Sequence, residues 1–159
     1  MRKLTMGLYT LIVCFMFTSC DLLGISQSPA KKIEKLAEDI NEHAEEWDVD
    51  QWTDAQRTFL EAVIDFGNSN PNQKDFDEFS DAAESFVEAL ADLENSDKAE
   101  KIISKIEKAS TKLKKEIKND KDLIKRAKSA VKNYEKILEK YGTEEDLQVF
   151  HFFTSSYDL

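Results

Sequence analysis

Residues that interrupt helices are scarce in this chain, whose 159 residues include only two Pro and four Gly. Pro removes a backbone donor and Gly weakens helices through its conformational freedom, so both usually mark turns. From Ala30 onward the apolar residues recur at steps of three and four, the period of an amphipathic helix. The sequence therefore predicts an all-α fold, an antiparallel helical bundle.

Histidine and cysteine are also scarce, with two of each. His43 and His151 lie in distant segments, and His43 with Glu46 is an i, i+3 pair that could in principle bind a metal. A histidine in such an acidic stretch is more often simply solvated. The chain has no Gly-rich phosphate loop, nucleophile elbow or paired-Cys zinc motif. We therefore expect no metal, no cofactor and no enzymatic activity.

A calcium-binding loop is excluded as well, although Asp48, Asp50 and Asp54 superficially suggest one. That loop needs Gly at its sixth position and Glu at its twelfth. This chain has Thr53 and Phe59 there. Its many carboxylates are typical instead of the solvated faces of amphipathic helices.

Long hydrophobic runs are missing except at the N-terminus, where residues 7–17 are uncharged and follow Arg2 and Lys3. A positive start followed by a short apolar run is typical of a secretory signal peptide. A helix that crosses a bilayer needs roughly 20 apolar residues, and Asp21 stops this run short of that length. The small residues Thr18 and Ser19 suit a signal peptidase.

The stretch Phe17-Thr18-Ser19-Cys20 resembles the lipidation box of bacterial lipoproteins, with Phe17 where that family usually has Leu. The resemblance implies that Cys20 receives a diacylglyceryl thioether, that residues 1–19 are removed, and that the new amine is acylated. A plain cleaved signal and a retained helix are the alternatives. The predicted organisation is a signal peptide at 1–19, a lipidated cysteine and tether at 20–29, and a helical domain at 30–159.

Lipidation would attach the mature protein to a membrane and consume its cysteine. Several acyl chains give a durable membrane anchor, and acylation of Cys20 together with loss of Cys14 leaves no thiol for a disulfide. We expect an exported protein at the outer membrane, on its periplasmic face or at the cell surface. Because Asp21 directly follows the cysteine, the inner membrane is the alternative location.

Three helices are expected between residue 30 and residue 94, each with one apolar stripe. A capping box at Thr53 and Gln56 is predicted for the second helix, and residues 67–72 form the clearest loop. The three stripes are Ile33, Leu36, Ile40, Ala44 and Trp47; Trp52, Ala55, Phe59, Val63 and Phe66; and Phe76, Phe79, Ala83, Phe86, Leu90 and Leu93.

Residues 98–141 keep one heptad register, which favours a single long or kinked helix. One series of core positions runs from Ile103 at every seventh residue, and the other runs from Ile106. Asp120 occupies an apolar position of the second series, so a hairpin of two helices is the alternative. Gly142 is expected to end this segment as a C-cap glycine.

The tail beyond Gly142 opens with a cap signature at residues 143–146 and then carries an aromatic cluster. The cluster either folds back onto the bundle or stays exposed for a partner, because an exposed aromatic group of this size marks an interaction site or an aggregation hazard. Its members Phe150, Phe152 and Phe153 are therefore candidate binding residues.

Charge is distributed unevenly along the chain. Residues 97–141 hold 15 Lys and Arg against 8 Asp and Glu, a net charge of +7, while the whole chain carries −10. A basic helix packed beside acidic ones accounts for this most simply. The alternative is contact with anionic lipid headgroups or polysaccharide. An export signal and an acidic total argue against nucleic acid.

Trp47 and Trp52 lie five residues apart in an acidic turn and are the remaining candidate binding residues. Either they plug the end of the bundle, or they form a flat aromatic surface for a glycan or small ligand. The run Glu-Glu-Trp-Asp-Val-Asp-Gln-Trp is similar to a segment of small helical envelope lipoproteins of unknown function from Gram-negative anaerobes. That resemblance covers this turn and its flanking helices, and it implies no activity.

Taken together, these features predict a non-catalytic, lipid-anchored envelope protein. Its expected role is structural or that of a protein-interaction module with an envelope protein as partner. The alternative role is binding of a glycan or small ligand at Trp47 and Trp52. The sequence leaves the oligomeric state open.

Overall fold

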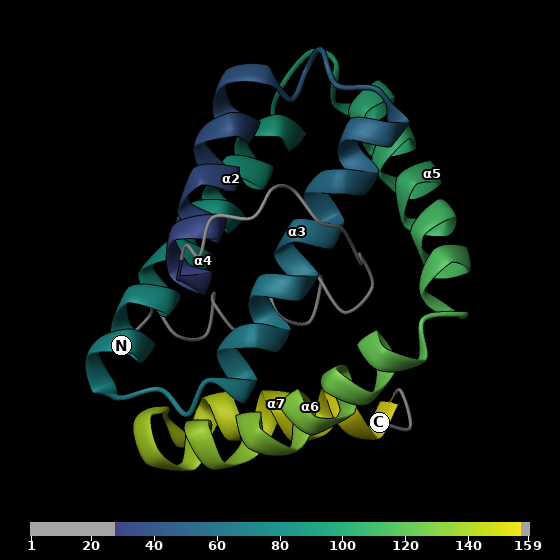
Figure 1. The fold of residues 1–159 in the computed structure, drawn as a ribbon. Coiled ribbons are helices and arrows are strands. Elements are labelled where there is room, and N and C mark those ends of the chain that lie inside the picture. The colour runs from purple at the N-terminus through teal and green to yellow at the C-terminus, as the bar shows by residue number, and fades with distance from the viewer. Residues whose placement is uncertain (1–27, 157–159) are drawn as a thin grey trace.

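The computed structural model describes residues 28–156, with side chains described as far as residue 152. Within that range it contains helices and no strands (Figure 1), so the predicted all-α helical bundle is confirmed. The predicted signal peptide, the lipidation site Cys20 and most of the 20–29 tether lie outside the described residues. The helices are α2 (Pro29–His43), α3 (Val49–Asn68), α4 (Gln73–Glu94), α5 (Ala99–Ile117), α6 (Lys121–Tyr141) and α7 (Glu144–Ser156).

Helices α2 to α5 run alternately up and down, and α6 and α7 cross the lower end of the bundle (Figure 1). Helix α3 is central: it contacts α2 on one side and both α5 and α6 on the other. Helix α2 packs along α4, and α7 lies against α6. The three predicted stripes of residues 30–94 face this shared core, with Trp47, Leu90 and Leu93 only partly buried.

The start of α3 differs from the prediction of a capping box at Thr53 and Gln56. The box is formed by Asp48 and Gln51: Asp48 Oδ1 accepts from the Gln51 backbone N–H at 2.8 Å, and Gln51 Oε1 accepts from the Asp48 N–H at 2.9 Å. Thr53 lies inside the helix, where its hydroxyl donates to the Val49 carbonyl. The earlier aspartate therefore begins α3, and Gln56 is free to bond elsewhere.

Residues 98–141 form two helices, so the prediction of one long or kinked helix is wrong. Asp120 caps α6, because its Oδ1 accepts from the Leu123 N–H at 2.9 Å, while its own N–H donates to the Ile117 carbonyl at 2.8 Å. A side chain bonded this way competes with helix continuation. The two helices are not an antiparallel hairpin either, because α5 and α6 each pack mainly on α3 and α6 turns across the end of the bundle (Figure 1).

The buried face of α5 and α6 agrees with the predicted register at Ser110, Leu113, Tyr134 and Leu138 and is displaced by one residue at other positions. Ile102 is only 2% exposed, whereas Ile103, a predicted core position, is 42% exposed. In α6 Leu123 is buried and Ile124 only half-buried. Adjacent isoleucines are equally apolar, so only the position of α3 and α4 decides which one turns inward. The buried residues of the two helices are Ile102, Ala109, Ser110, Leu113, Leu123, Ala130, Tyr134, Ile137 and Leu138.

Helices α3 and α6 approach each other closely at Gly67. A Cβ at this position would lie 2.7 Å from Tyr134 Cε2 and 2.9 Å from Ala130 Cβ, closer than such atoms pack. The Phe66 ring beside it stacks on Phe79 of α4 with 3.9 Å between centroids and 8° between planes. The absence of a side chain at Gly67 therefore allows α6 to pack across the lower end of α3.

The end of α6 and the start of α7 follow the sequence prediction. Helix α6 ends at Tyr141, and the Gly142 N–H donates to the Leu138 carbonyl at 2.8 Å. The predicted cap in residues 143–146 is formed by Thr143 and Asp146: Asp146 Oδ2 accepts from both the N–H and the hydroxyl of Thr143. These bonds redirect the chain so that α7 returns along α6.

Candidate functional site

The two tryptophans lie together at the upper end of the bundle. Their ring centroids are 5.0 Å apart and their planes meet at 78°, an edge-to-face contact. Trp52 is 2% exposed and Trp47 is half-buried. Lys105 of α5 donates a hydrogen bond to the Trp47 carbonyl at 2.7 Å. This bond links the turn between α2 and α3 to α5. Because Trp52 is enclosed, the two indoles do not form an exposed flat surface.

The aromatic tail is divided between the core and the surface. Phe150 is partly buried and packs against the core together with Leu147 and Val149. Phe152 is 76% exposed. The side chain of Phe153 lies outside the described residues. Phe150 therefore packs onto the bundle, which was one of the two alternatives, whereas Phe152 lies at the surface.

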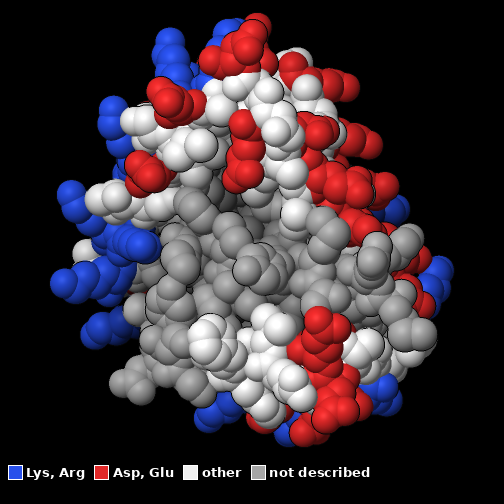
Figure 2. Space-filling view, turned by 180° about the vertical axis from the view of Figure 1, so that it is seen from behind, with Lys and Arg blue, Asp and Glu red and all other residues white. Residues whose placement is uncertain are grey.

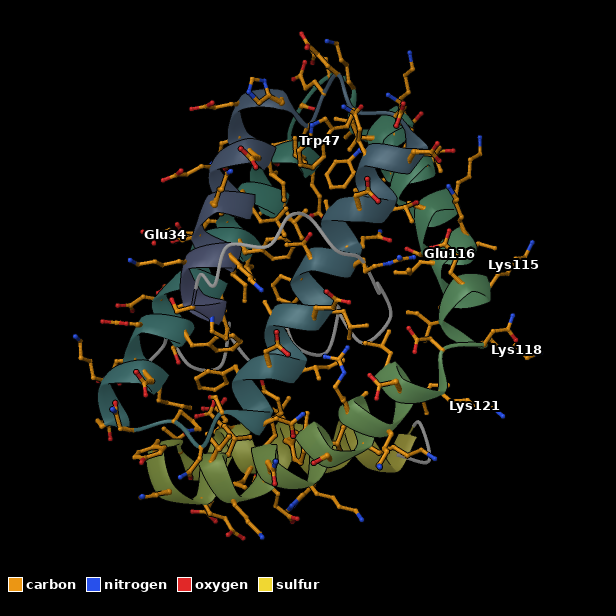
Figure 3. All side chains as sticks on the ribbon, in the orientation of Figure 1. Glu34, Trp47, Lys115, Glu116, Lys118 and Lys121 are labelled. Atoms are coloured by element: carbon orange, nitrogen blue, oxygen red, sulfur yellow. The ribbon has the colours of Figure 1, made fainter. Side chains whose placement is uncertain are left out.

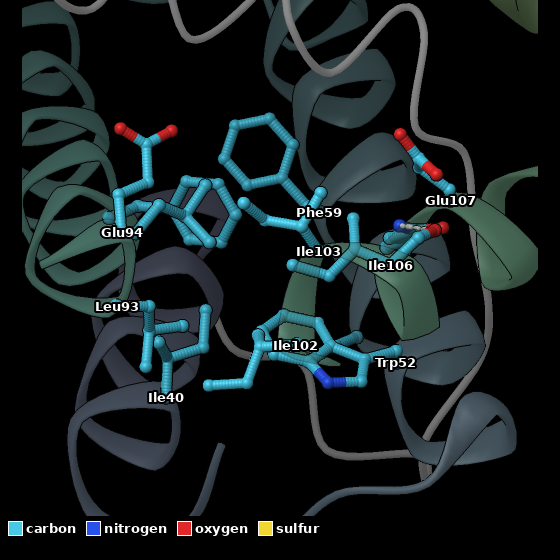
Figure 4. Close-up of a pocket in the computed structure, with 13 residues that line it drawn as sticks. Ile40, Trp52, Phe59, Leu93, Glu94, Ile102, Ile103, Ile106 and Glu107 are labelled. Atoms are coloured by element: carbon cyan, nitrogen blue, oxygen red, sulfur yellow. Dashed lines mark hydrogen bonds between the residues drawn. The ribbon is translucent and has the colours of Figure 1, made fainter. Parts of the chain in front are cut away.

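A cavity of about 230 Å³ lies between the upper parts of α3, α4 and α5, with Ile40 of α2 at its base (Figure 4). Its walls are largely apolar and include Trp52, Phe59, Leu93, Ile102 and Ile106. The partly exposed Ile103 lies at its edge. The cavity lies where α4 and α5 have few close backbone contacts with each other.

Among the described residues, Trp52 Nε1 and Gln56 Oε1 are buried polar atoms without a hydrogen-bond partner, and both belong to residues that line the cavity. Gln56 is itself only 7% exposed. Its Nε2 donates to the Ile106 carbonyl at 3.2 Å and to Ser110 Oγ at 3.1 Å. Both unpartnered atoms are enclosed rather than accessible, and the cavity wall is largely apolar.

Carboxylates flank one end of the cavity. Glu94 at the end of α4 and Glu107 in the middle of α5 line it from opposite sides, whereas Trp52 and Ile40 lie toward the other end (Figure 4). Both glutamates are exposed, and neither forms an ion pair with another described residue. Their charge gives the entrance a negative potential.

Ion pairs join α5 and the residue before it to the acidic α2–α3 turn and to α3. Lys98 bonds Glu45 at 2.7 Å, which raises the pKa of Lys98, and Lys112 bonds Asp50 at the same distance. Arg57 of α3 pairs with Glu116 farther down α5. The intramolecular explanation of the charge asymmetry therefore accounts for part of the basic segment.

Other lysines of this segment point away from the bundle and form a basic edge, defined here as Lys101, Lys108, Lys115, Lys118 and Lys121. All five are exposed, and none pairs with a carboxylate among the described residues. Figure 3 shows Lys115, Lys118 and Lys121 extending outward where α5 gives way to α6. In Figure 2 the cations gather along this edge of the molecule, and acidic side chains cover much of the opposite side.

The opposite side includes α4, a helix that carries eight acidic residues along its length and the single cation Lys74. Helix α2 adds further exposed carboxylates such as Glu34. The folded domain therefore has one basic edge and one acidic side, rather than evenly mixed charges.

The histidines stay far from one another in the described structure. His43 lies beside Glu42, with 3.5 Å between Nε2 and a carboxylate oxygen, and His151 of α7 contacts Glu135 of α6 at 2.7 Å. Residues 28–156 contain no group of three or more His, Cys, Asp and Glu side chains arranged to hold a metal ion. None of the helices in that range combines the length and apolarity needed to cross a bilayer.

These features define an all-α helical bundle with an apolar cavity and a basic edge. Comparison of the chain with protein-family models, with curated proteins and with solved structures finds no match. Arguments about function therefore rest on the residues themselves.

The sequence does not predict the cavity, because it indicates other roles for two of the residues that line it. The sequence assigns Gln56 to a helix cap and Ile103 to the core, whereas both residues line the cavity. One signal was available: Gln56 interrupts an apolar stripe four residues after Trp52 and three before Phe59. A polar residue within an apolar face has to find a partner when buried.

Proposed function

We propose that this protein is a non-catalytic, lipid-anchored protein of the cell envelope that docks an acidic partner protein along its basic edge. The observation that carries the docking role is the row of exposed lysines on α5 and at the start of α6 that form no ion pair with any described residue. Such a patch steers an oppositely charged surface toward a defined orientation. The anchor is Cys20, on the strength of the lipidation box.

A protein partner fits this edge better than an anionic lipid surface does. Glu100, Glu107 and Glu116 lie on α5 among the lysines and are also exposed. A lipid surface attracts clustered cations and repels interspersed carboxylates, whereas a protein partner can match both signs. The net charge of −10 also disfavours close contact of the whole domain with anionic lipid.

The alternative role, binding of a glycan or ligand on an aromatic surface at Trp47 and Trp52, has less support. Stacking on a sugar needs an accessible ring face, and Trp52 has none, since it is 2% exposed and covered by Trp47 on one side. The exposed Phe152 could extend a docking surface, but it belongs to α7 rather than to the basic edge.

The anchor and its location are tested by metabolic acyl labelling with membrane fractionation. Wild-type protein is expected to incorporate label and to sediment with the outer membrane, whereas Cys20→Ser is expected to lose the label and become soluble. Equal labelling of the two proteins, or a soluble wild type, contradicts the anchor. Sedimentation with the inner membrane contradicts only the proposed location.

The docking edge is tested by site-specific photo-crosslinking in intact cells. A crosslinker at Lys108 or Lys115 is expected to capture one discrete protein, and a crosslinker at Glu88 on the acidic face of α4 is the matched control. The double variant Lys108→Glu/Lys115→Glu is expected to abolish capture by a crosslinker at Lys118. Equal capture from α4, or capture that survives charge reversal, argues against the basic edge.

A further inference from the structure

We propose that the cavity between α3, α4 and α5 binds the single alkyl chain of a small amphiphile whose polar end is not anionic. This site is separate from the basic edge, since its walls face the interior of the bundle (Figure 4). It also depends on neither lipidation nor a protein partner, so it goes beyond the docking role.

Apolar side chains on both sides of the cavity are incompletely covered by the fold. Leu90 and Leu93 of α4 and Ile106 of α5 are only partly buried, and Ile103 is 42% exposed. All four line the cavity, which lies where α4 and α5 have few close backbone contacts. Wall atoms that face a void lack dispersion contacts, and removing apolar surface from water is favourable. A hydrocarbon group in the cavity would provide both.

The interior of the cavity favours hydrocarbon over polar groups. The Gln56 amide nitrogen already donates to the Ile106 carbonyl and to Ser110 Oγ. Gln56 Oε1 and Trp52 Nε1 are enclosed, so a ligand in the cavity does not reach them. A polar group placed inside would therefore lose its hydration without gaining a partner. The polar end of the ligand is expected to stay outside, where exposed glutamates flank the cavity (Figure 4).

The size and shape of the cavity favour one extended chain. Its lining runs from Phe86 to Glu94 on α4 and from Trp52 to Phe59 on α3. At 1.5 Å per residue these stretches are about 12 Å and about 10 Å long, so a volume of only about 230 Å³ makes the cavity narrow. By proportion to an apolar protein cavity of about 150 Å³ that binds benzene, it has room for roughly eight to ten carbon atoms. A membrane lipid with two longer chains does not fit.

The glutamates at the entrance determine which charge the polar end can carry. Glu94 and Glu107 line the cavity from α4 and α5, both are exposed, and neither forms an ion pair with another described residue. Two carboxylates disfavour an anionic group between them, and this repulsion weakens with salt. A free fatty acid is therefore expected to be a poor ligand, whereas an alcohol or an amine with the same chain is not repelled.

Affinities along a series of primary alcohols test the cavity. The full chain carrying Cys20→Ser is used, so that no attached acyl chain competes. Tryptophan fluorescence follows binding, because Trp52 lines the cavity and Trp47 contacts it. From 1-hexanol to 1-octanol the affinity is expected to rise about fourfold per methylene group. Beyond roughly ten carbon atoms it is expected to level off, since further methylene groups do not fit.

Two outcomes of this series overturn the site itself. One is the absence of saturable binding by all the alcohols. The other is an affinity that rises at the same rate through 1-dodecanol, because an unlimited rise indicates non-specific partitioning onto apolar surface rather than a cavity of fixed size.

Compounds of other shapes test the assignment of one extended chain. Cyclooctanol has as many carbon atoms as 1-octanol but is compact, and dihexanoylphosphatidylcholine carries two chains on one head. Both are expected to bind more weakly than 1-octanol. Equal or tighter binding of cyclooctanol overturns the extended chain, and equal or tighter binding of the phospholipid overturns the single chain and makes a membrane lipid the ligand.

Octyl compounds with charged ends test the entrance. At low salt, octanoate is expected to bind about tenfold more weakly than 1-octanol, with a smaller difference at high salt. Octylammonium is expected to bind at least as tightly as 1-octanol. Octanoate binding as tightly as 1-octanol, or octylammonium binding more weakly, overturns the assignment of the polar end.

A substitution inside the cavity tests its position. Ala55 lines the cavity and is 7% exposed, so Ala55→Leu is expected to fill part of the space and to lower the chain length at which the affinity levels off. Ala91→Leu, at an exposed position of α4 outside the cavity, is the matched control. The same limiting chain length in both variants contradicts the site.

Charge reversal at the entrance provides a test without a core substitution. Glu94→Lys/Glu107→Lys is expected to bind octanoate more tightly than 1-octanol. Glu88→Lys/Glu100→Lys changes the net charge equally at exposed positions outside the cavity, and it is expected to keep the wild-type order. The same order in both double variants overturns the role of the entrance. If Ala55→Leu does not fold, this pair and the alcohol series still decide.

Discussion

The Tyr134 hydroxyl of α6 donates a 2.7 Å hydrogen bond to the Val63 carbonyl of α3, 71 residues earlier in the chain. The side chain is buried, and this burial, with a smaller effect of Asp65, raises the pKa of Tyr134 well above its usual value. The bond lies beside Gly67, where the two helices approach most closely. Tyr134 therefore orients α6 across the end of the bundle as well as filling space there.

Replacing Tyr134 by Phe is expected to lower the free energy of unfolding by about 1 kcal/mol, the usual net contribution of one hydrogen bond. Urea denaturation at pH 7 measures the change. Tyr141→Phe is the matched control, because its hydroxyl bonds the Pro71 carbonyl from a partly buried position at 3.1 Å. A larger loss at Tyr141 than at Tyr134 would contradict the assigned importance of the Val63 bond.

The same tyrosine predicts a change of stability at alkaline pH. Because the folded pKa lies above the unfolded value of about 10, the unfolded chain loses this proton first as the pH rises. The wild type is therefore expected to lose about 1.4 kcal/mol per pH unit from this group above about pH 10, and nothing from it below. Tyr134→Phe lacks this loss, so the difference between the two proteins is expected to shrink only above pH 10. A difference that stays constant from pH 8 to pH 11 would show that Tyr134 titrates normally.

Replacing Gly67 by Ala tests the close packing of α3 and α6, because that packing determines whether the variant is more or less stable. In an exposed helix, Gly→Ala stabilises by about 1 kcal/mol. Here the added methyl would meet the Tyr134 ring at 2.7 Å, so Gly67→Ala is expected to destabilise the fold by about 1 to 3 kcal/mol through overpacking. Thermal and urea denaturation measure it. Stabilisation by this variant would mean that α3 and α6 are not packed this closely.

Much of the fold could be predicted because residues 30–94 carry strong local signals. Each stripe there repeats at steps of three and four, and Asn72 with the residues around it supplies a loop and a cap. The break at Asp120 could not be decided in the same way. A heptad register continues through three residues of turn, and only contact of α5 and α6 with α3 shows that the chain bends.

The candidate site could be predicted less well, because it depends on tertiary geometry. The type and neighbours of Trp52 indicate a binding role, yet its burial and its place at the cavity depend on how α5 packs. The local sequence favours a helix cap at Gln56, although its amide reaches α5, 50 residues away in sequence. Long-range partners of this kind leave no local pattern.

Asp120 tests the origin of the bend. Asp120→Ala removes the side chain that accepts from the Leu123 N–H, and it is expected to lower the free energy of unfolding by about 1 kcal/mol. Asp122→Ala, in the first turn of α6, is the control: it removes only an exposed contact with Arg126, so a loss below about 0.5 kcal/mol is expected. Urea denaturation of both variants measures the difference. Equal losses would mean that Asp120 does not act as the cap.

The adjacent isoleucines of α5 test which face of that helix is buried. Ile102→Ala removes a side chain that is 2% exposed and is expected to cost about 2 to 5 kcal/mol of unfolding free energy. Ile103→Ala removes one that is 42% exposed at the cavity edge, so its cost is expected to stay below about 1 kcal/mol. The two changes are chemically identical and one position apart, which makes each the control for the other. If Ile103→Ala proved the more costly, α5 would be rotated toward the heptad register, Ile103 would fill the space between α3 and α4, and the cavity would be closed.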